Sequence, residues 1–158
     1  IHIGGVGMKI NDSRITSKAF KKDQVVLIVR KNHPLTLLEK VHAKDLLKYP
    51  LVVREKGSGS RRLLEEQLEK KGLRLKSFPY FNELSGSRAG ITAVKNSDSL
   101  AFVSSLVAED SVSLGDVVNI ELDDFNMNRN IYLIYNNLKT LSPLSETFVN
   151  FILKNMDK

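Results

Sequence analysis

The sequence contains no cysteine and no tryptophan, and only 7% of its residues are aromatic. Without cysteine, no disulfide framework can form, which excludes the class of small secreted domains that disulfides stabilise. A zinc site would also lack its thiolate ligands. No apolar run approaches the roughly 20 residues that span a bilayer, and the first residues lack the basic segment of a signal peptide. We therefore expect a cytoplasmic protein with no metal, no other cofactor and no membrane contact.

The chain is nevertheless long enough to bury a core. It has 158 residues, of which 42% are hydrophobic, and this size suits one ordinary domain or two small lobes. The first residue is Ile1 rather than methionine, and it lies inside a stretch expected to form a strand. We therefore expect the sequence to be a fragment of a longer protein.

Positive charge is concentrated in the first part of the chain. Residues 1–96 carry 20 Lys and Arg against 9 Asp and Glu, whereas residues 97–158 carry 4 against 9. A basic region attracts nucleic acid, a membrane surface or a small anion. The alternative is that these side chains only solvate exposed helix faces. No basic run is long enough to indicate a disordered arm that binds nucleic acid.

Short apolar runs rich in β-branched residues alternate with segments of helical periodicity. Most of the runs are continuously apolar, which is typical of strands covered on both faces, as in parallel sheets. The expected strands are Ile1–Val6, Gln24–Arg30, Leu51–Arg54, Phe78–Asn82, Leu100–Ser104, Val117–Leu122 and Ile131–Tyr135.

The expected helices lie between these strands. Arg61–Lys71 places Leu64 and Leu68 on one face and ends at Gly72, a residue type common just after helix ends. Ser142 is the expected N-cap of a last helix that starts at Pro143. That last helix has an apolar stripe formed by Leu144, Phe148, Phe151 and Ile152. Shorter helices are expected over Ala43–Lys48, Ser87–Asn96 and Ser105–Asp110. The alternation predicts an α/β fold.

A Gly-Ser turn between a buried strand and a helix is the most informative motif. Gly57 and Gly59 permit backbone conformations closed to other residues, and Ser58 and Ser60 add hydroxyl groups. Backbone amides at a helix start attract an anion such as a carboxylate, and Arg61 is a possible further contact. The alternative is that a serine only caps the helix. The spacing matches neither a phosphate-binding P-loop nor the nucleophile elbow of hydrolases.

A second loop, from Glu83 to Arg88, also joins a strand to a helix. Ser85 and Ser87 offer hydroxyls or amides at this helix start, or they serve only as caps. Both loops follow strands, so both are expected at the carboxyl edge of one sheet, where open α/β sheets bind ligands.

The sequence motifs do not include a recognisable set of catalytic residues. The three histidines, His2, His33 and His42, have no metal-ligand spacing, and for His33 we expect a capping or surface role. No nucleophile has a base and an orienting acid near it in a recognisable motif. We therefore expect no catalytic residue and no enzyme activity.

The order of the motifs carries a further indication. The sequence reads NHPL over residues 32–35, REKGSGSR over 54–61, AFVS over 101–104 and LSP over 141–143, before the terminal helix. In this order the chain resembles the effector-binding domain of LysR-type bacterial transcription regulators. The resemblance implies a fold like type II periplasmic binding proteins, with two lobes that contain mixed sheets. Residues 24–128 would form one complete lobe, and residues 1–23 and 129–158 would form parts of the other.

The resemblance also implies which residues meet a ligand. A small, anionic effector would bind in the cleft between the lobes, contacted by Ser58, Gly59, Ser60, Gly5, Val6, Ser85 and Ser87. DNA would be bound only by a winged helix-turn-helix domain, which this sequence does not contain, and the protein would self-associate as a dimer or tetramer. The family has glycines where this chain has Ser97 and Ser99, and an aspartate where it has His2.

Two other classes of protein remain open at this point. One is the solute-binding protein of a transporter, which would share the fold and reuse the Gly-Ser turn. The other is an enzyme built on the same fold, although no acid and base residues support it.

Overall fold

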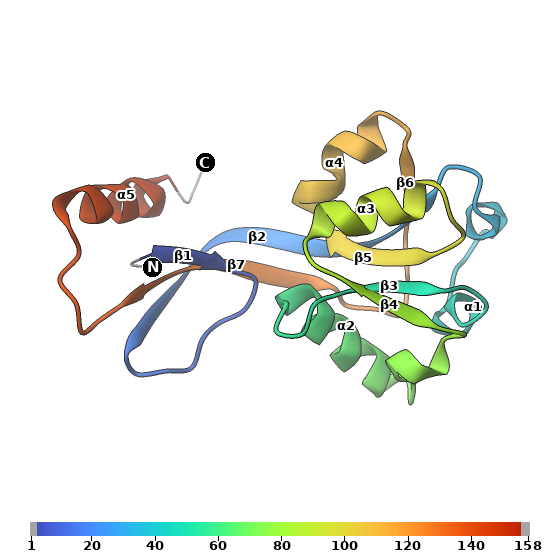
Figure 1. Ribbon diagram of the computed structural model, residues 1–158, viewed down its shortest axis with the longest axis horizontal. Coiled ribbons are helices and arrows are strands. Elements are labelled where there is room, and N and C mark those ends of the chain that lie inside the picture. The colour runs from blue at the N-terminus through green and yellow to red at the C-terminus, as the bar shows by residue number, and fades with distance from the viewer. Residues whose placement is uncertain (1–2, 156–158) are drawn as a thin grey trace. The chain divides into compact units, whose positions relative to one another are not determined.

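The computed structural model describes residues 3–155 and divides into two compact units (Figure 1). Unit 1 comprises Ile1–Asp23 and Asn128–Lys158, and unit 2 comprises Gln24–Met127. Ile1 and His2, which belong to the first expected strand, lie outside the described residues.

Unit 2 is built on a mixed sheet. Its strands are the second half of β2 (Ile15–Arg30), β3 (Leu51–Arg54), β4 (Phe81–Leu84), β5 (Leu100–Ser104) and β6 (Val117–Ile120). They lie in the order β4–β3–β5–β2–β6. β3 is parallel to both β4 and β5, whereas β2 is antiparallel to β5 and β6. The predicted α/β class with a mixed sheet is confirmed.

Helices cover both faces of this sheet, as Figure 1 shows. α2 (Gly59–Lys70) packs Leu64 and Leu68 against one face. α3 (Ser87–Lys95) and α4 (Ser105–Ser113) pack on the other face through residues such as Ile91 and Ala108. β2 alternates between the two cores, since Val25, Leu27 and Val29 join the first and Val26 and Ile28 the second. A strand buried on both faces is therefore continuously apolar.

Short elements complete unit 2. They are two 3₁₀ helices, Pro34–Leu37 and Leu75–Ser77, and α1 (Ala43–Leu46). The end of α2 follows the prediction, because Gly72 has a φ of 70° and Leu73 N–H donates to the carbonyl of Leu68 (2.9 Å). This is the Schellman geometry that favours glycine after a helix.

Unit 1 contains β1 (Ile3–Val6), the first half of β2 and β7 (Asn128–Asn136), with β7 between the other two. α5 (Pro143–Lys154) follows. Ser142 caps α5 as predicted: its Oγ accepts a hydrogen bond from Ser145 N–H (3.2 Å).

Several predicted bounds differ from the structure by two or three residues: α2 starts at Gly59 rather than Arg61, β6 ends at Ile120 rather than Leu122, and β7 starts at Asn128 rather than Ile131. β4 starts at Phe81 rather than Phe78, because Phe78 is buried in the core that α2 covers and ends a 3₁₀ helix. β2 starts nine residues earlier than Gln24, at Ile15, where pairing with β7 compensates for a polar sequence. The predicted stripe of α5 is largely exposed (Leu144 81%, Phe151 63%), and Val149 is the buried residue.

Candidate functional site

Three helices begin at one edge of the unit 2 sheet. β3, β4 and β5 are parallel, so their carboxyl ends lie at the same edge, and α2, α3 and α4 follow them at Gly59, Ser87 and Ser105. The two Gly-Ser loops therefore meet at one sheet edge, as the sequence predicted. Helix starts carry unpaired backbone amides and partial positive charge, so this edge suits an anionic group.

The turn before α2 has the geometry of an open helix start. Ser58 is the N-cap residue, but its side chain makes no capping hydrogen bond. Its N–H donates to the carbonyl of Glu55 (3.1 Å), and Gly57 has a φ of 90°, which only glycine adopts at little cost. Ser58 and Gly59 are half-buried, and Ser60 is buried. The alternative that Ser58 serves only as a helix cap is therefore not supported, because its side chain does not make the capping hydrogen bond.

Arg61, the possible anion contact, has other partners. Its side chain is 9% exposed, and its Nε donates to Glu65 Oε1 (2.9 Å). Its Nη1 donates to Glu83 on β4 and to the carbonyl of Arg54 (3.2 Å). Burial lowers the pKa of Arg61, but the hydrogen bonds and charges of Glu65 and Glu83 together raise it above its ordinary value. Arg61 thus ties α2 to β3 and β4.

The second loop already holds a carboxylate of the protein. Glu55 accepts hydrogen bonds from Arg54 Nε (2.8 Å), from Arg54 Nη2 (2.7 Å) and from the backbone N–H of Gly86 (3.2 Å), the N-cap of α3. Arg54 Nη1 donates to Ser87 Oγ (2.7 Å). The guanidinium beside Glu55 lowers the pKa of that carboxyl to about 2. Of the two predicted serines, Ser87 joins this network and Ser85 is exposed.

Gly5 and Val6, the other predicted ligand contacts, lie in unit 1. They end β1 and pair with Leu133 and Tyr132 of β7. Gly5 is exposed, with open space around its α-carbon.

Sequence reasoning missed Ser104 and Ser105, which bring a third helix start to the sheet edge. Ser104 is the buried N-cap residue of α4 and directly ends β5. The signal was present, because the sequence LAFVSS joins a buried strand to a helix, as the two Gly-Ser loops do, although here no loop lies between the two elements.

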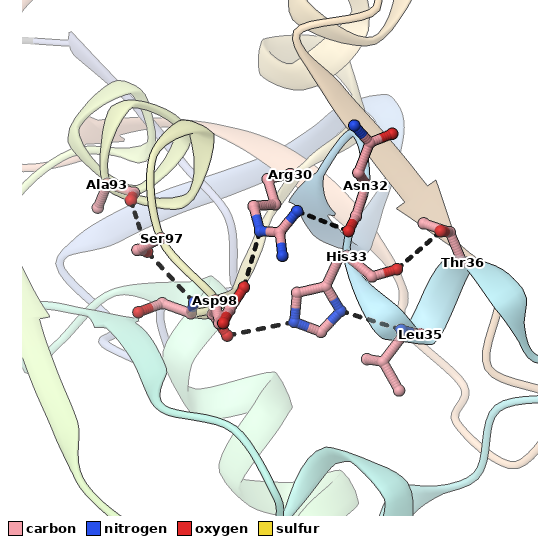
Figure 2. A network of polar contacts seen from close by, with 9 residues as sticks. Arg30, Asn32, His33, Leu35, Thr36, Ala93, Ser97 and Asp98 are labelled. Carbon is pink, nitrogen blue, oxygen red and sulfur yellow. Dashed lines mark hydrogen bonds and ion pairs between the residues drawn. The ribbon is translucent and has the colours of Figure 1, made fainter.

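His33 has the predicted capping role and is also buried. Its Nδ1 accepts from Leu35 N–H (3.1 Å), and Nε2 lies 3.2 Å from the carbonyl of Asp98 (Figure 2). This pattern requires the neutral ring with its proton on Nε2. Burial lowers the pKa of His33, which keeps the ring neutral.

The same network includes Ser97 and Ser99, the two positions at which the family resemblance implies glycine. Ser97 Oγ donates to the carbonyl of Ala93 (2.8 Å) and accepts from Ser99 N–H (3.2 Å), while Asp98 pairs with Arg30 (2.7 Å), as Figure 2 shows. Among the described residues, only glycines have a positive φ. Hydroxyl capping thus shapes this loop without left-handed backbone.

Comparisons with known proteins extend these observations. The mixed sheet with helices on both faces and helix starts at one edge gives a fold like that of type II periplasmic binding proteins. The sequence matches the family described as LysR substrate binding domain over residues 1–157, and the chain belongs to this family. The resemblance drawn from the motif order is confirmed. The match favours a transcription regulator over the solute-binding protein of a transporter.

Individual relatives agree with this family. The chain is 27% identical over 139 residues to the HTH-type transcriptional activator CmpR of Synechocystis, covering 87% of this chain and 44% of that protein. It spans about half the length of the curated relatives it matches. In fold it is similar to the Synechocystis PCC6803 CcmR regulatory domain in complex with 2-PG, with a TM-score of 0.82, 20% identity and coverage of 97% and 72% of the two chains.

A second solved structure, the effector binding domain of QuiR in complex with shikimate, has a TM-score of 0.83 at 19% identity, covering 99% and 72% of the two chains. Residues 3–155 contain no helix that is both long and apolar enough to cross a bilayer. Across the same residues, no three His, Asp or Glu side chains gather as a metal site would require.

Proposed function

We propose that this chain senses a small anionic effector, and that Ser58, Gly59 and Ser60 at the start of α2 bind its negative group. The observation that carries the proposal is the open start of α2, where Ser58 makes no capping hydrogen bond. Backbone amides at this position hold a carboxylate or phosphate by charge-assisted hydrogen bonds. Ser85 and Ser87 contribute from the start of α3, whereas the effector contacts of Gly5 and Val6 stay a prediction from the family resemblance.

The effector acts by shifting a conformational equilibrium. A ligand changes such an equilibrium only by its different affinity for the two states. In the whole protein we propose that the bound effector biases a DNA-bound dimer or tetramer, whose DNA contacts belong to a separate winged helix-turn-helix domain. The curated relatives are transcriptional regulators, which supports a sensing role rather than catalysis.

The test is a thermal-shift screen of small carboxylates, amino-acid derivatives and oxyanions against this chain, followed by calorimetry on the compounds that bind. A hydrogen bond to a charged group contributes about 1.5–3 kcal/mol, so we expect Ser60→Ala to weaken binding by about tenfold or more.

The matched control is Ser113→Ala, which removes an exposed hydroxyl near the end of α4. It should leave the affinity unchanged. If Ser60→Ala binds every compound as tightly as the parent chain does, the assignment of the anion site to α2 is wrong.

A further inference from the structure

Glu55 connects two of the helix starts at the sheet edge. Its backbone carbonyl accepts from Ser58 N–H (3.1 Å), which belongs to the N-cap of α2. Its carboxylate accepts from Gly86 N–H (3.2 Å), which belongs to the N-cap of α3. One residue therefore contacts both turns, and its negative charge occupies a donor at the start of α3.

The carboxylate of Glu55 also occupies hydrogen-bond donors of the neighbouring Arg54. Arg54 gives two of its donors to Glu55, in the bidentate arrangement that makes such pairs strong, and a third to Ser87. The side chains of Arg54 and Glu55 are 21% and 35% exposed, so solutes reach both.

The two arginines of the turn are paired with carboxylates of the protein. Arg54 pairs with Glu55, and Arg61 pairs with Glu65 and Glu83. An anion at the start of α2 therefore meets amides and hydroxyls, while both of these guanidinium groups already hold carboxylates. A second anionic group would have to compete with Glu55 for Arg54.

We infer that Glu55 is a specificity-determining residue, whose fixed carboxylate makes the site select effectors with one anionic group over effectors with two. A second anionic group on the ligand would meet the charge of Glu55, and the nearby donors of Arg54 and Gly86 are already occupied. This inference rests on the proposed function, because it assumes that an anion binds at the start of α2.

The test compares two probes of equal length, succinate and its monoamide succinamate, which differ by one negative charge. Calorimetry at matched ionic strength gives the ratio of their dissociation constants for each variant of the full 158-residue chain. Glu55→Gln keeps the shape of the side chain but removes its charge. We expect this substitution to shift the ratio in favour of succinate by about tenfold, the effect of one charge-assisted hydrogen bond.

Glu66→Gln is the matched control, because it makes the same change of net charge in the exposed Arg62–Glu66 pair on α2. It should leave the ratio as it is in the parent chain. Glu55→Ala, which empties the position, should shift the ratio in the same direction as Glu55→Gln. Amide spectra of each variant check that the fold is kept.

The outcomes separate the two proposals. If the ratio is the same in the parent chain and both Glu55 variants, or if succinate binds none of them, the role of Glu55 is overturned. A ligand found in the screen that depends on Ser60 would then still support the anion site. If the ratio shifts as expected while Ser60→Ala has no effect on any ligand, Glu55 sets specificity but the site is not at the start of α2.

Discussion

At the scale of single residues, His33 couples the stability of unit 2 to pH. The ring is fully buried and neutral, and Nδ1 must stay unprotonated to accept the Leu35 N–H. Burial lowers the pKa of His33 below its ordinary value of 6.5, so the unfolded chain binds a proton there more readily than the folded chain. The stabilisation is complete above that pH and declines as the pH falls from 6.5 toward the lower folded-state pKa.

We predict that His33→Asn flattens this dependence. Asparagine still provides an oxygen for the Leu35 N–H but does not titrate. In urea unfolding between pH 8 and pH 5, the parent chain should lose up to about 1.4 kcal/mol per pH unit relative to the variant once the pH is below 6.5. The variant should be less stable at pH 8, because it loses the hydrogen bond to Asp98. If the unfolding free energies of the parent chain and His33→Asn change in parallel with pH, the conclusion that His33 is buried as a neutral ring is contradicted.

The ion pair between Asp23 and Arg129 is the most buried one among the described residues. The Asp23 side chain is 0% exposed and accepts from both Nε (2.8 Å) and Nη2 (2.7 Å) of Arg129. A Cβ at Gly7 would lie 2.7 Å from Nη1, so a larger residue there would displace the guanidinium of Arg129.

We predict that Asp23→Asn lowers the free energy of unfolding by about 3–5 kcal/mol, because it leaves a buried guanidinium without its carboxylate. Asp116→Asn, in the partly exposed pair with Lys95, should cost no more than about 1 kcal/mol. Urea unfolding of both variants checks the difference, and equal losses would show that the Asp23 pair is not effectively buried.

At the scale of elements, two serines occupy the same position on two helices but differ in use. Ser142 caps α5 through its side chain, whereas the side chain of Ser58 does not cap α2. We predict that Ser142→Ala costs about 1 kcal/mol of unfolding free energy and that Ser58→Ala costs at most a few tenths. Thermal unfolding of the two variants distinguishes them. A larger loss for Ser58→Ala would mean that its hydroxyl is a structural cap.

The sequence predicted correctly those strands and helix starts that depend on neighbouring residues in the chain. β3 and β5 match their predicted bounds, and the starts of α3 and α4 were correct, because continuous apolar runs and Ser or Gly boundaries are local signals. β4 was placed three residues early, since burial of Phe78 depends on packing against the core under α2. The ion pair between Arg61 and Glu83 could not be predicted from the sequence either, because Glu83 approaches Arg61 only when β4 pairs with β3.

At the scale of the whole molecule, the order of motifs was more informative than any single motif. The Gly-Ser turn alone left capping and anion binding open, whereas its position between NHPL and AFVS indicated the family that the comparison confirmed. The basic first part of the chain did not predict how charge is arranged, because carboxylates pair with both arginines of the turn, Arg54 and Arg61. We propose that helix-start amides, rather than excess lysine and arginine, hold the anion.

The most direct test of this account is an amide chemical-shift titration of the ¹⁵N-labelled chain with a compound that binds in the screen. We predict that the largest shifts, saturating with the calorimetric dissociation constant, fall on the amides of Gly59 and Ser60, and that Ser60→Ala weakens them. Saturating shifts confined to other parts of the chain, with Gly59 and Ser60 unmoved, would contradict the anion site at the start of α2.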